Sequence, residues 1–420
     1  MTKKQTKRQD ALLIVISSII VVLLTLFSLA DFWTNGSPLY SVLGPILNRL
    51  IRPSAPHSTA YLNSDFIVIR DSLYGYPTGE VIFYKVQNDG SVKRVYDIRH
   101  CSPDMLRPVR IGDAFYFPNN NADHYESDNY IAILKDGRVT RKKIGFPSVE
   151  NIVCLNGNFF IASRWAVCKF DKDMNLIKRV NVSNIIPKGF DIEYLYEYKE
   201  TLWAMVSVRN NGENFSLLFA KLDPSNLKAV KVMKFPYFLS SITQFNGKTY
   251  ALGTDFAVKS TGTQTGHDAI YEFAPTPKLV YVSPYKTLHT DEPGRIDPYT
   301  FSVFRTSQII PVDPSKKEFA LIGRSEFIIS ETGKLKKLLP WPHGKDYLYF
   351  TSTKKFFALP EEFRDENDDF SSDHGIYCKG YIYIGRRNYL LEFKDGKFTI
   401  ADRYVSGNNY NIPFICASGN

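Results

Sequence analysis

One unit of four short strands recurs along most of this chain, about every 45 residues. Its clearest copy spans residues 151–180, where apolar strands are separated by a turn at Asn156-Gly157 and by a charged turn before the fourth strand. Further copies span 241–255, 316–339 and 375–404. The first hairpin of the unit falls near seven positions, the first five of them 43–48 residues apart: Ser64, Gly112, Gly157, Glu200, Gly247, Lys317 and Gly380. Such a unit cannot bury its apolar face alone, so successive units must pack on one another.

This pattern resembles a β-propeller, whose blades have four strands and typically run about 40–50 residues. Seven copies predict an all-β domain over residues 58–420, with seven blades of four antiparallel strands. Residues 346–360 predict an extra hairpin, which leaves eight blades open, and a pair of β-sandwiches is the structural alternative. Residues 411–418 predict a strand that closes the ring against the first blade. The resemblance is to the architecture only, because no kelch double glycine, WD dipeptide or quinoprotein docking signature is present.

The first 30 residues predict a membrane anchor. Residues 1–10 form a basic tail, and residues 11–30 contain no charged side chain. At about 1.5 Å per residue, such a helix crosses a hydrocarbon core of roughly 30 Å, and the basic tail stays cytoplasmic. We therefore expect a single-pass signal-anchor helix, with the bulk of the chain extracytoplasmic, either periplasmic or extracellular. The small residues of Ser28-Leu29-Ala30 leave a cleaved signal peptide as the alternative. Residues 31–57 predict a juxtamembrane stem, either a helix on the membrane surface or one packed against the propeller.

Composition argues against several classes of partner and site. The net charge is +9, but no dense run of Lys or Arg follows residue 10, so no nucleic acid partner is expected. The five cysteines are odd in number and widely spaced, which argues against a disulfide framework or a zinc site. Cys154 and Cys168 are expected on strands with another strand between them, too far apart for a disulfide. The sequence contains no G-x-S-x-G, H-E-x-x-H or P-loop motif, and we predict no cofactor.

The long connections of the predicted blades gather on one face. With the strands lettered A to D from the axis outward, the A–B and C–D turns are short and the B–C and D–A connections are long. The long segments are 71–79, 119–128, 209–215, 255–267, 284–298 and 340–374. Function tends to reside on long loops held by a rigid scaffold, so this face is expected to carry the site. It also receives most of the histidines: His124, His267, His289 and His374.

Arginine recurs on the same face, directly after strand B in five blades: Arg70, Arg164, Arg209, Arg324 and Arg386. With His124 and His267, these arginines are the candidate ligand-binding residues, because guanidinium groups hold phosphate or carboxylate groups in pairs of hydrogen bonds. The alternative is structural. Each Arg would then pair with a neighbouring carboxylate and tie strand B to strand A.

Carboxylates precede the first hairpin by 7–9 residues in four blades, at Asp104, Glu150, Asp191 and Asp373. These residues are expected to ring the mouth of the central channel, and they are the catalytic candidates if the protein is an enzyme. A weak metal candidate lies in the acidic loop 361–374, where Asp365, Asn367 and Asp369 have the spacing of a calcium loop. Phe370 stands where that loop needs its sharp-turn Gly, which favours a solvated loop.

Three functions are compatible with this sequence. The leading hypothesis is a membrane-anchored extracytoplasmic propeller that binds an envelope protein or an anionic polysaccharide without catalysis. The alternative is a propeller-type glycan hydrolase or lyase, which needs two carboxylates roughly 5–9.5 Å apart at the channel mouth. The third is an assembly scaffold bound through the blade edges. The fold does not decide among them, because propellers host many functions.

Overall fold

The chain divides into two compact units, 1–57 and 58–420, and the computed structural model describes residues of the second. The described ranges are 58–70, 80–99, 107–119, 130–144, 149–163, 165–187, 189–210, 214–237, 239–256, 264–289, 304–325, 345–363, 374–386, 389–404 and 414–419. The predicted basic tail, anchor helix and stem lie outside these ranges. Within them, no helix is both long enough and apolar enough to cross a membrane.

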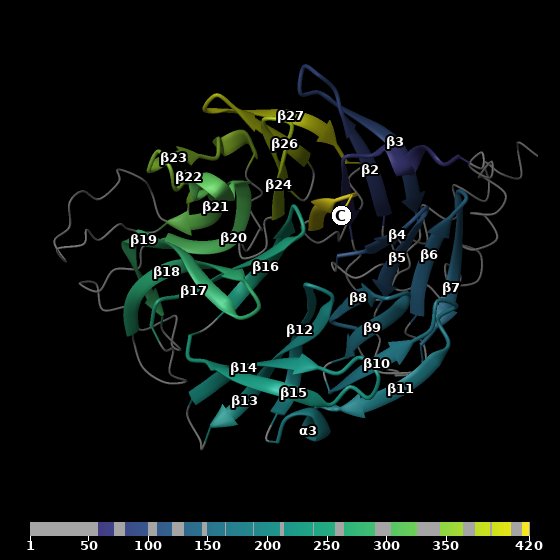
Figure 1. Ribbon diagram of the computed structural model, residues 1–420. Helices are drawn as coiled ribbons and strands as arrows, with labels where there is room; N and C mark the ends of the chain where they lie inside the picture. The colour runs from purple at the N-terminus through teal and green to yellow at the C-terminus, as the bar shows by residue number, and fades with distance from the viewer. Residues whose placement is uncertain are drawn as a thin grey trace, which may run out of the picture. The chain divides into compact units, whose positions relative to one another are not determined.

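The described residues form seven four-stranded antiparallel sheets, arranged as a ring in chain order (Figure 1). The first blade, from the axis outward, consists of β28 (Phe414–Ala417), β1 (Phe66–Arg70), β2 (Glu80–Val86) and β3 (Val92–Arg99). The second consists of β4 (Val109–Ile111), β5 (Ala114–Asn119), β6 (Tyr130–Lys135) and β7 (Arg138–Lys143). The third consists of β8 (Asn151–Leu155), β9 (Asn158–Ser163), β10 (Ala166–Phe170) and β11 (Leu176–Asn181). The predicted seven-bladed propeller is therefore confirmed.

The remaining blades repeat the arrangement. The fourth consists of β12 (Gly189–Tyr198), β13 (Thr201–Asn210), β14 (Asn214–Leu222) and β15 (Ala229–Phe235). The fifth consists of β16 (Leu239–Phe245), β17 (Lys248–Thr254), β18 (Gln264–Phe273) and β19 (Pro277–His289). The sixth consists of β20 (Phe304–Asp313), β21 (Glu318–Ser325), β22 (Lys345–Phe350) and β23 (Lys355–Ala358). The seventh consists of β24 (His374–Cys378), β25 (Tyr381–Gly385), β26 (Tyr389–Lys394) and β27 (Lys397–Arg403). The short helices are α3 (Val182–Ile185), η1 (Ala60–Asn63), η2 (Pro314–Lys316) and η3 (Glu361–Phe363).

The ring closes through a strand from the far end of the chain, as the sequence predicts. β28 pairs antiparallel with β1, with Phe66 opposite Ala417 and Ile69 opposite Phe414. Asp65 joins the first blade to the seventh, because its carboxylate accepts hydrogen bonds from Lys379 of the seventh blade (2.9 Å) and from the backbone N–H of Val86 in β2 (2.8 Å). The last strand therefore completes the first blade.

Two details of the predicted repeat are wrong. The residues before Ser64 were expected to form the inner strand of the first blade, but they form η1, and β28 takes the inner place. In the sixth blade, the copy at 316–339 was expected to hold the third strand, which is instead β22. The hairpin expected at 346–360 is therefore the outer half of the sixth blade, and the described sheets number seven rather than eight. The segment 340–374 is accordingly not one long connection.

Tight turns set the hairpins between inner strands. Asn156 and Gly157 have φ values of 51° and 70°, and Asn246 and Gly247 have values of 49° and 71°. Two successive positive φ values define the type I′ turn, whose twist matches that of the flanking strands and which favours Asn-Gly. This is why these dipeptides predict the hairpins correctly.

The apolar core is divided among the contacts between neighbouring blades. One cluster of buried side chains joins Phe83 of the first blade to Phe117 of the second, and another joins Val68 of the first blade to Tyr383 of the seventh. The Phe66 ring lies 5.2 Å from that of Tyr84 and 5.0 Å from that of Tyr383, between centroids. Each blade thus depends on its neighbours for burial of its two faces.

Candidate functional site

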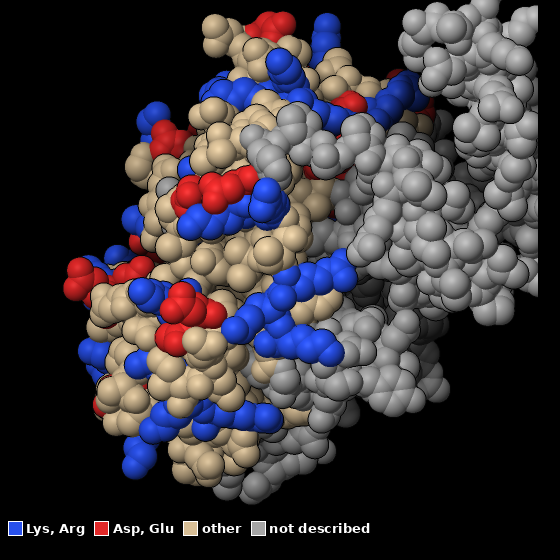
Figure 2. All heavy atoms as spheres, turned by 90° about the vertical axis from the view of Figure 1, so that its right-hand side faces the viewer, with Lys and Arg blue, Asp and Glu red and all other residues tan. Residues whose placement is uncertain are grey.

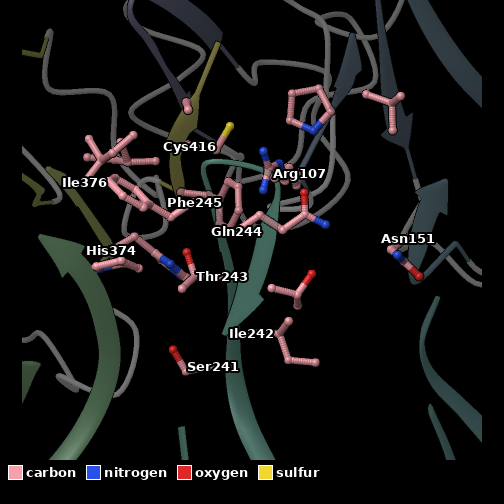
Figure 3. A pocket seen from close by; sticks show the side chains of 18 of the residues that line it. Arg107, Asn151, Ser241, Ile242, Thr243, Gln244, Phe245, His374, Ile376 and Cys416 are labelled. Atoms are coloured by element: carbon pink, nitrogen blue, oxygen red, sulfur yellow. The ribbon is translucent and has the colours of Figure 1, made fainter. Parts of the chain in front are cut away.

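The seven inner strands surround an axial cavity of about 650 Å³. This volume lies within the range of about 300–1,000 Å³ that is usual for small-molecule sites. Aromatic and aliphatic side chains, such as Phe245, Ile376 and Phe414, share the wall with the polar side chains of Ser241, Thr243 and Gln244 (Figure 3).

Strand β16 contributes each of its residues from Ser241 to Phe245 to this wall. Ser241 has a φ of 43°, and the register with β17 shifts between Ser240 and Ile242. A bulge of this kind bends the strand and re-aims its side chains. The residues from Ser241 to Gly247 all line the cavity as a result.

Polar side chains fix the inner strands to one another. The Asn151 amide donates to the Leu195 carbonyl (2.6 Å) and accepts from the Leu195 N–H (2.8 Å), which joins β8 to β12. The Gln308 side chain accepts from the N–H of Gly375 (2.6 Å), which joins β20 to β24. The wall of the cavity is therefore built on fixed backbone.

The predicted ring of carboxylates is only partly within the described ranges. Glu150 directly precedes β8 and lines the cavity, whereas Asp191, in β12, is not among the lining residues. Asp104 and Asp373 lie outside the described residues. Two carboxylates that were not predicted, Glu193 and Glu197, also line the cavity. Both are engaged, since Ser207 donates to Glu193 and the N–H of Glu200 donates to Glu197 (2.8 Å).

Arg70 lies where the pattern predicts, at the end of the second strand of its blade, but it is buried. Only 1% of Arg70 and 8% of Glu80 are exposed. Its Nη1 donates to Oε2 of Glu80 at 3.0 Å, and its guanidinium lies 4.4 Å from the ring centroid of Tyr404 in the neighbouring blade. This arrangement matches the structural alternative, with the partner on the third strand rather than on the inner one.

The other predicted arginines give less information. Arg386 is 1% exposed and follows β25, and its backbone closes a tight turn with Tyr389. Arg324 lies in β21 directly opposite Asp346 in the register with β22, and Arg209 lies in β13 opposite Phe215. Arg164 lies outside the described residues. The described strands do not gather the predicted ring of arginines into one exposed site.

Of the predicted histidines, His374 lines the cavity at the start of β24, whereas His267 is not among the lining residues (Figure 3). His267 lies in β18. Its ring Nδ1 is 3.0 Å from one carboxylate oxygen of Asp255, and its backbone N–H donates to the other oxygen. His124 lies outside the described residues, as do Asp365, Asn367 and Asp369. No cluster of three or more potential metal ligands occurs in the ranges that the structure describes.

Arg107 lines the cavity, and no sequence pattern singled it out. It precedes β4 as an isolated Arg next to Pro108, outside the positions at which arginine recurs. No hydrogen bond or ion pair joins it to another described residue. Arg110, within β4, is different: its Nε donates to the Gly112 carbonyl (3.2 Å), and its guanidinium lies 5.4 Å from the Phe115 ring centroid.

The outer edge of the propeller carries a strong excess of positive charge. The seven outer strands together hold sixteen Lys or Arg and two acidic residues, Asp97 and Asp402. The seven inner strands hold two Arg and four acidic residues. On the side of the molecule that carries β7, Lys and Arg cover more of the described surface than Asp and Glu (Figure 2). We refer to the outer strands β3, β7, β11, β15, β19, β23 and β27 as the basic rim.

No family model and no curated protein matches this sequence. Among solved structures, a candidate 6-phosphogluconolactonase of Bacteroides fragilis is 10% identical, with 84% of this chain and 98% of that chain covered and a TM-score of 0.46. AztD of Citrobacter koseri is 12% identical, with 84% and 98% covered and a TM-score of 0.43. The β-propeller domain of the Trilobed protease of Pyrococcus furiosus is 13% identical, with 70% and 83% covered and a TM-score of 0.34. Likeness at these identities concerns the propeller fold alone.

Proposed function

We propose that this chain is a non-enzymatic binding module, which holds an anionic polysaccharide along its basic rim. The observation that carries the proposal is the contrast in charge between the rim and the inner strands. Lys and Arg outnumber acidic residues eightfold on the outer strands, whereas acidic residues are in the majority on the inner ones. The excess therefore does not simply follow the composition of the chain.

Protection of exposed strand edges does not explain the uniform sign. Charged side chains on an outer strand, Lys in particular, prevent edge-to-edge pairing of sheets, but this protection does not require the arginines that β7 and β11 also carry. β7, β11 and β15 carry eight Lys or Arg and no acidic residue, and most of their residues are exposed. A partner of negative charge is the physical reason that favours one sign.

A polymer suits this rim better than a small ligand does. Each exposed Lys or Arg near an anionic surface contributes only about 1 kcal/mol. A chain of repeating anionic groups can contact several blades at once, and each added contact then raises the affinity. Glu193 and Glu197 each accept a hydrogen bond from another group of the protein. This is compatible with a function that does not use them as acid or base.

The binding test compares two double variants in titrations with polygalacturonate at about 150 mM salt, where the Debye length is about 8 Å. Lys231→Gln with Lys234→Gln removes two charges from β15 and should weaken binding about 10- to 30-fold, since each charge is worth about fivefold. Lys199→Gln with Lys317→Gln removes two exposed charges from the turns between inner strands and should change the affinity less than about twofold. Affinity for polygalacturonate should also fall as salt rises, and neutral dextran should not bind.

Equal weakening in the two double variants, or binding that is independent of salt, would contradict a specific role for the rim. Failure of polygalacturonate to bind at all, while an acidic protein domain binds with the same dependence on Lys231 and Lys234, would replace the polysaccharide by a protein partner.

We also propose that residues 11–30 anchor the chain and that the propeller is extracytoplasmic. The uncharged run behind a basic tail supports this placement. A reporter enzyme that is active only after export should be active when it is fused after residue 60. Activity from a reporter restricted to the cytoplasm would reverse the topology, and loss of an N-terminal tag from the mature protein would indicate a cleaved signal.

A further inference from the structure

Arg107 brings a permanent positive charge to the axial cavity from the start of the second blade (Figure 3). The guanidinium group stays protonated at all accessible pH values, so its charge must be balanced by a neighbour or by water. Among the described residues, none forms a hydrogen bond or an ion pair with it. A charge in a partly apolar cavity gains stability when a counter-charge arrives.

Two groups that sense this charge, Cys416 and Tyr194, are neutral. Burial raises the pKa of the Cys416 thiol to about 12, and the charge of Arg107 opposes this shift. Burial also raises the pKa of Tyr194, again with Arg107 acting in the opposite direction. Both groups are protonated near neutral pH, so neither balances the guanidinium. Cys416 belongs to the first blade and Tyr194 to the fourth, so groups of three blades meet near Arg107.

We propose that the axial cavity binds a small organic anion, whose carboxylate or phosphate group is held by Arg107 between Tyr194 and Cys416. The planar guanidinium presents paired N–H donors that match both of these groups. Gln244 donates to the Tyr194 hydroxyl (3.2 Å), which leaves the Tyr194 O–H free to turn toward the bound anion. This site is separate from the basic rim, and its ligand is a small molecule rather than a polymer.

The rest of the wall defines the body of the ligand. Phe245, Ile376 and Phe414 offer apolar contacts, and Ser241 and Thr243 offer hydroxyl groups. Glu150, Glu193 and Glu197 also line the cavity and repel negative charge, so an anionic group is favoured only where it contacts Arg107 directly. The wall therefore fits a ligand with one anionic group and an uncharged ring or aliphatic body, such as an aromatic acid or a phosphate monoester.

The test is calorimetric titration of the full chain with phenyl phosphate and benzoate, and with benzamide as a neutral analogue. We expect at least one anion to bind and benzamide not to bind, and the tighter of the two anions identifies the preferred group. Arg107→Gln should weaken that binding about 10- to 100-fold, the range of a hydrogen-bonded charged pair. Arg110→Gln is the matched control, because this second cavity Arg already donates to Gly112, and it should leave the affinity within about twofold.

Arg107→Lys keeps the charge without the paired donors and should bind with intermediate affinity, which covers the case in which Arg107→Gln fails to fold. The rim variant Lys231→Gln with Lys234→Gln should bind phenyl phosphate normally. The proposal for the cavity and the proposal for the rim can therefore be tested separately. The proposal is overturned if neither anion binds the unmodified chain at about 10 mM. It is also overturned if benzamide binds equally well, or if Arg107→Gln and Arg110→Gln have the same effect.

Discussion

A chain that ends at Tyr404 should lose the closure of the ring and melt at least about 10 °C below the full chain. The truncation removes β28, so the ladder between Phe66–Ile69 and Phe414–Ala417 disappears. Ile415 and Cys416 are 3% and 7% exposed, and loss of each buried side chain costs about 2–5 kcal/mol. In a domain of this size, each kcal/mol lowers the melting temperature by roughly 2 °C.

Tyr404 is kept in this truncation because it lies against Arg70, so the closing strand is tested alone. The matched control ends at Ser418, whose hydroxyl donates to the Ser64 carbonyl, and it should melt with the full chain. Differential scanning calorimetry provides the measurement. Identical melting of all three chains would show that the pairing of β28 with β1 contributes nothing to stability.

Glu80→Gln should lower the free energy of unfolding by about 3–5 kcal/mol, because it removes the charge that pairs with Nη1 of the buried Arg70. Replacement of both partners, Arg70→Met with Glu80→Leu, should restore most of the loss, since neither charge of this pair is then buried. Denaturant unfolding followed by circular dichroism measures the three proteins.

The same series distinguishes the two roles considered for Arg70. If Arg70 is structural, the double variant should bind polygalacturonate as the unmodified chain does. A loss of binding in the stable double variant would instead return Arg70 to the ligand site. A change below about 1 kcal/mol in Glu80→Gln would mean that solvent screens the pair.

The sequence alone predicts the blades wherever local rules decide. Asn-Gly turns with positive φ mark the hairpins at Gly157 and Gly247, and the apolar tail at 411–418 contains the strand that closes the ring. The errors arise where pairing is not local. Several apolar runs compete for the third place in the sixth blade, and strand propensity does not state which of them pairs with β21. Likewise, β1 takes its inner partner from the opposite end of the domain.

The site was harder to predict than the fold. The pattern places Arg70 and Arg386 correctly at the ends of their strands, but position along a strand does not reveal burial. Glu80 becomes the partner of Arg70 only through the register of β1 and β2. Arg107 belongs to no recurring pattern, and its importance depends on which groups of other blades the fold brings near it.

Closure by β28 also fixes the order in which the domain can be completed as it is synthesised. The hydrogen bond between Ser418 and Ser64 joins residues 354 positions apart, so the first blade waits through the production of all the others. Until the seventh blade is made, the face of Phe66 that finally stacks on Tyr383 has no partner. The growing chain thus carries exposed aromatic surface on its first blade, the kind of intermediate that chaperones bind. The four residues of β28 end this exposure in one step, which makes their arrival the event that commits the chain to its native ring.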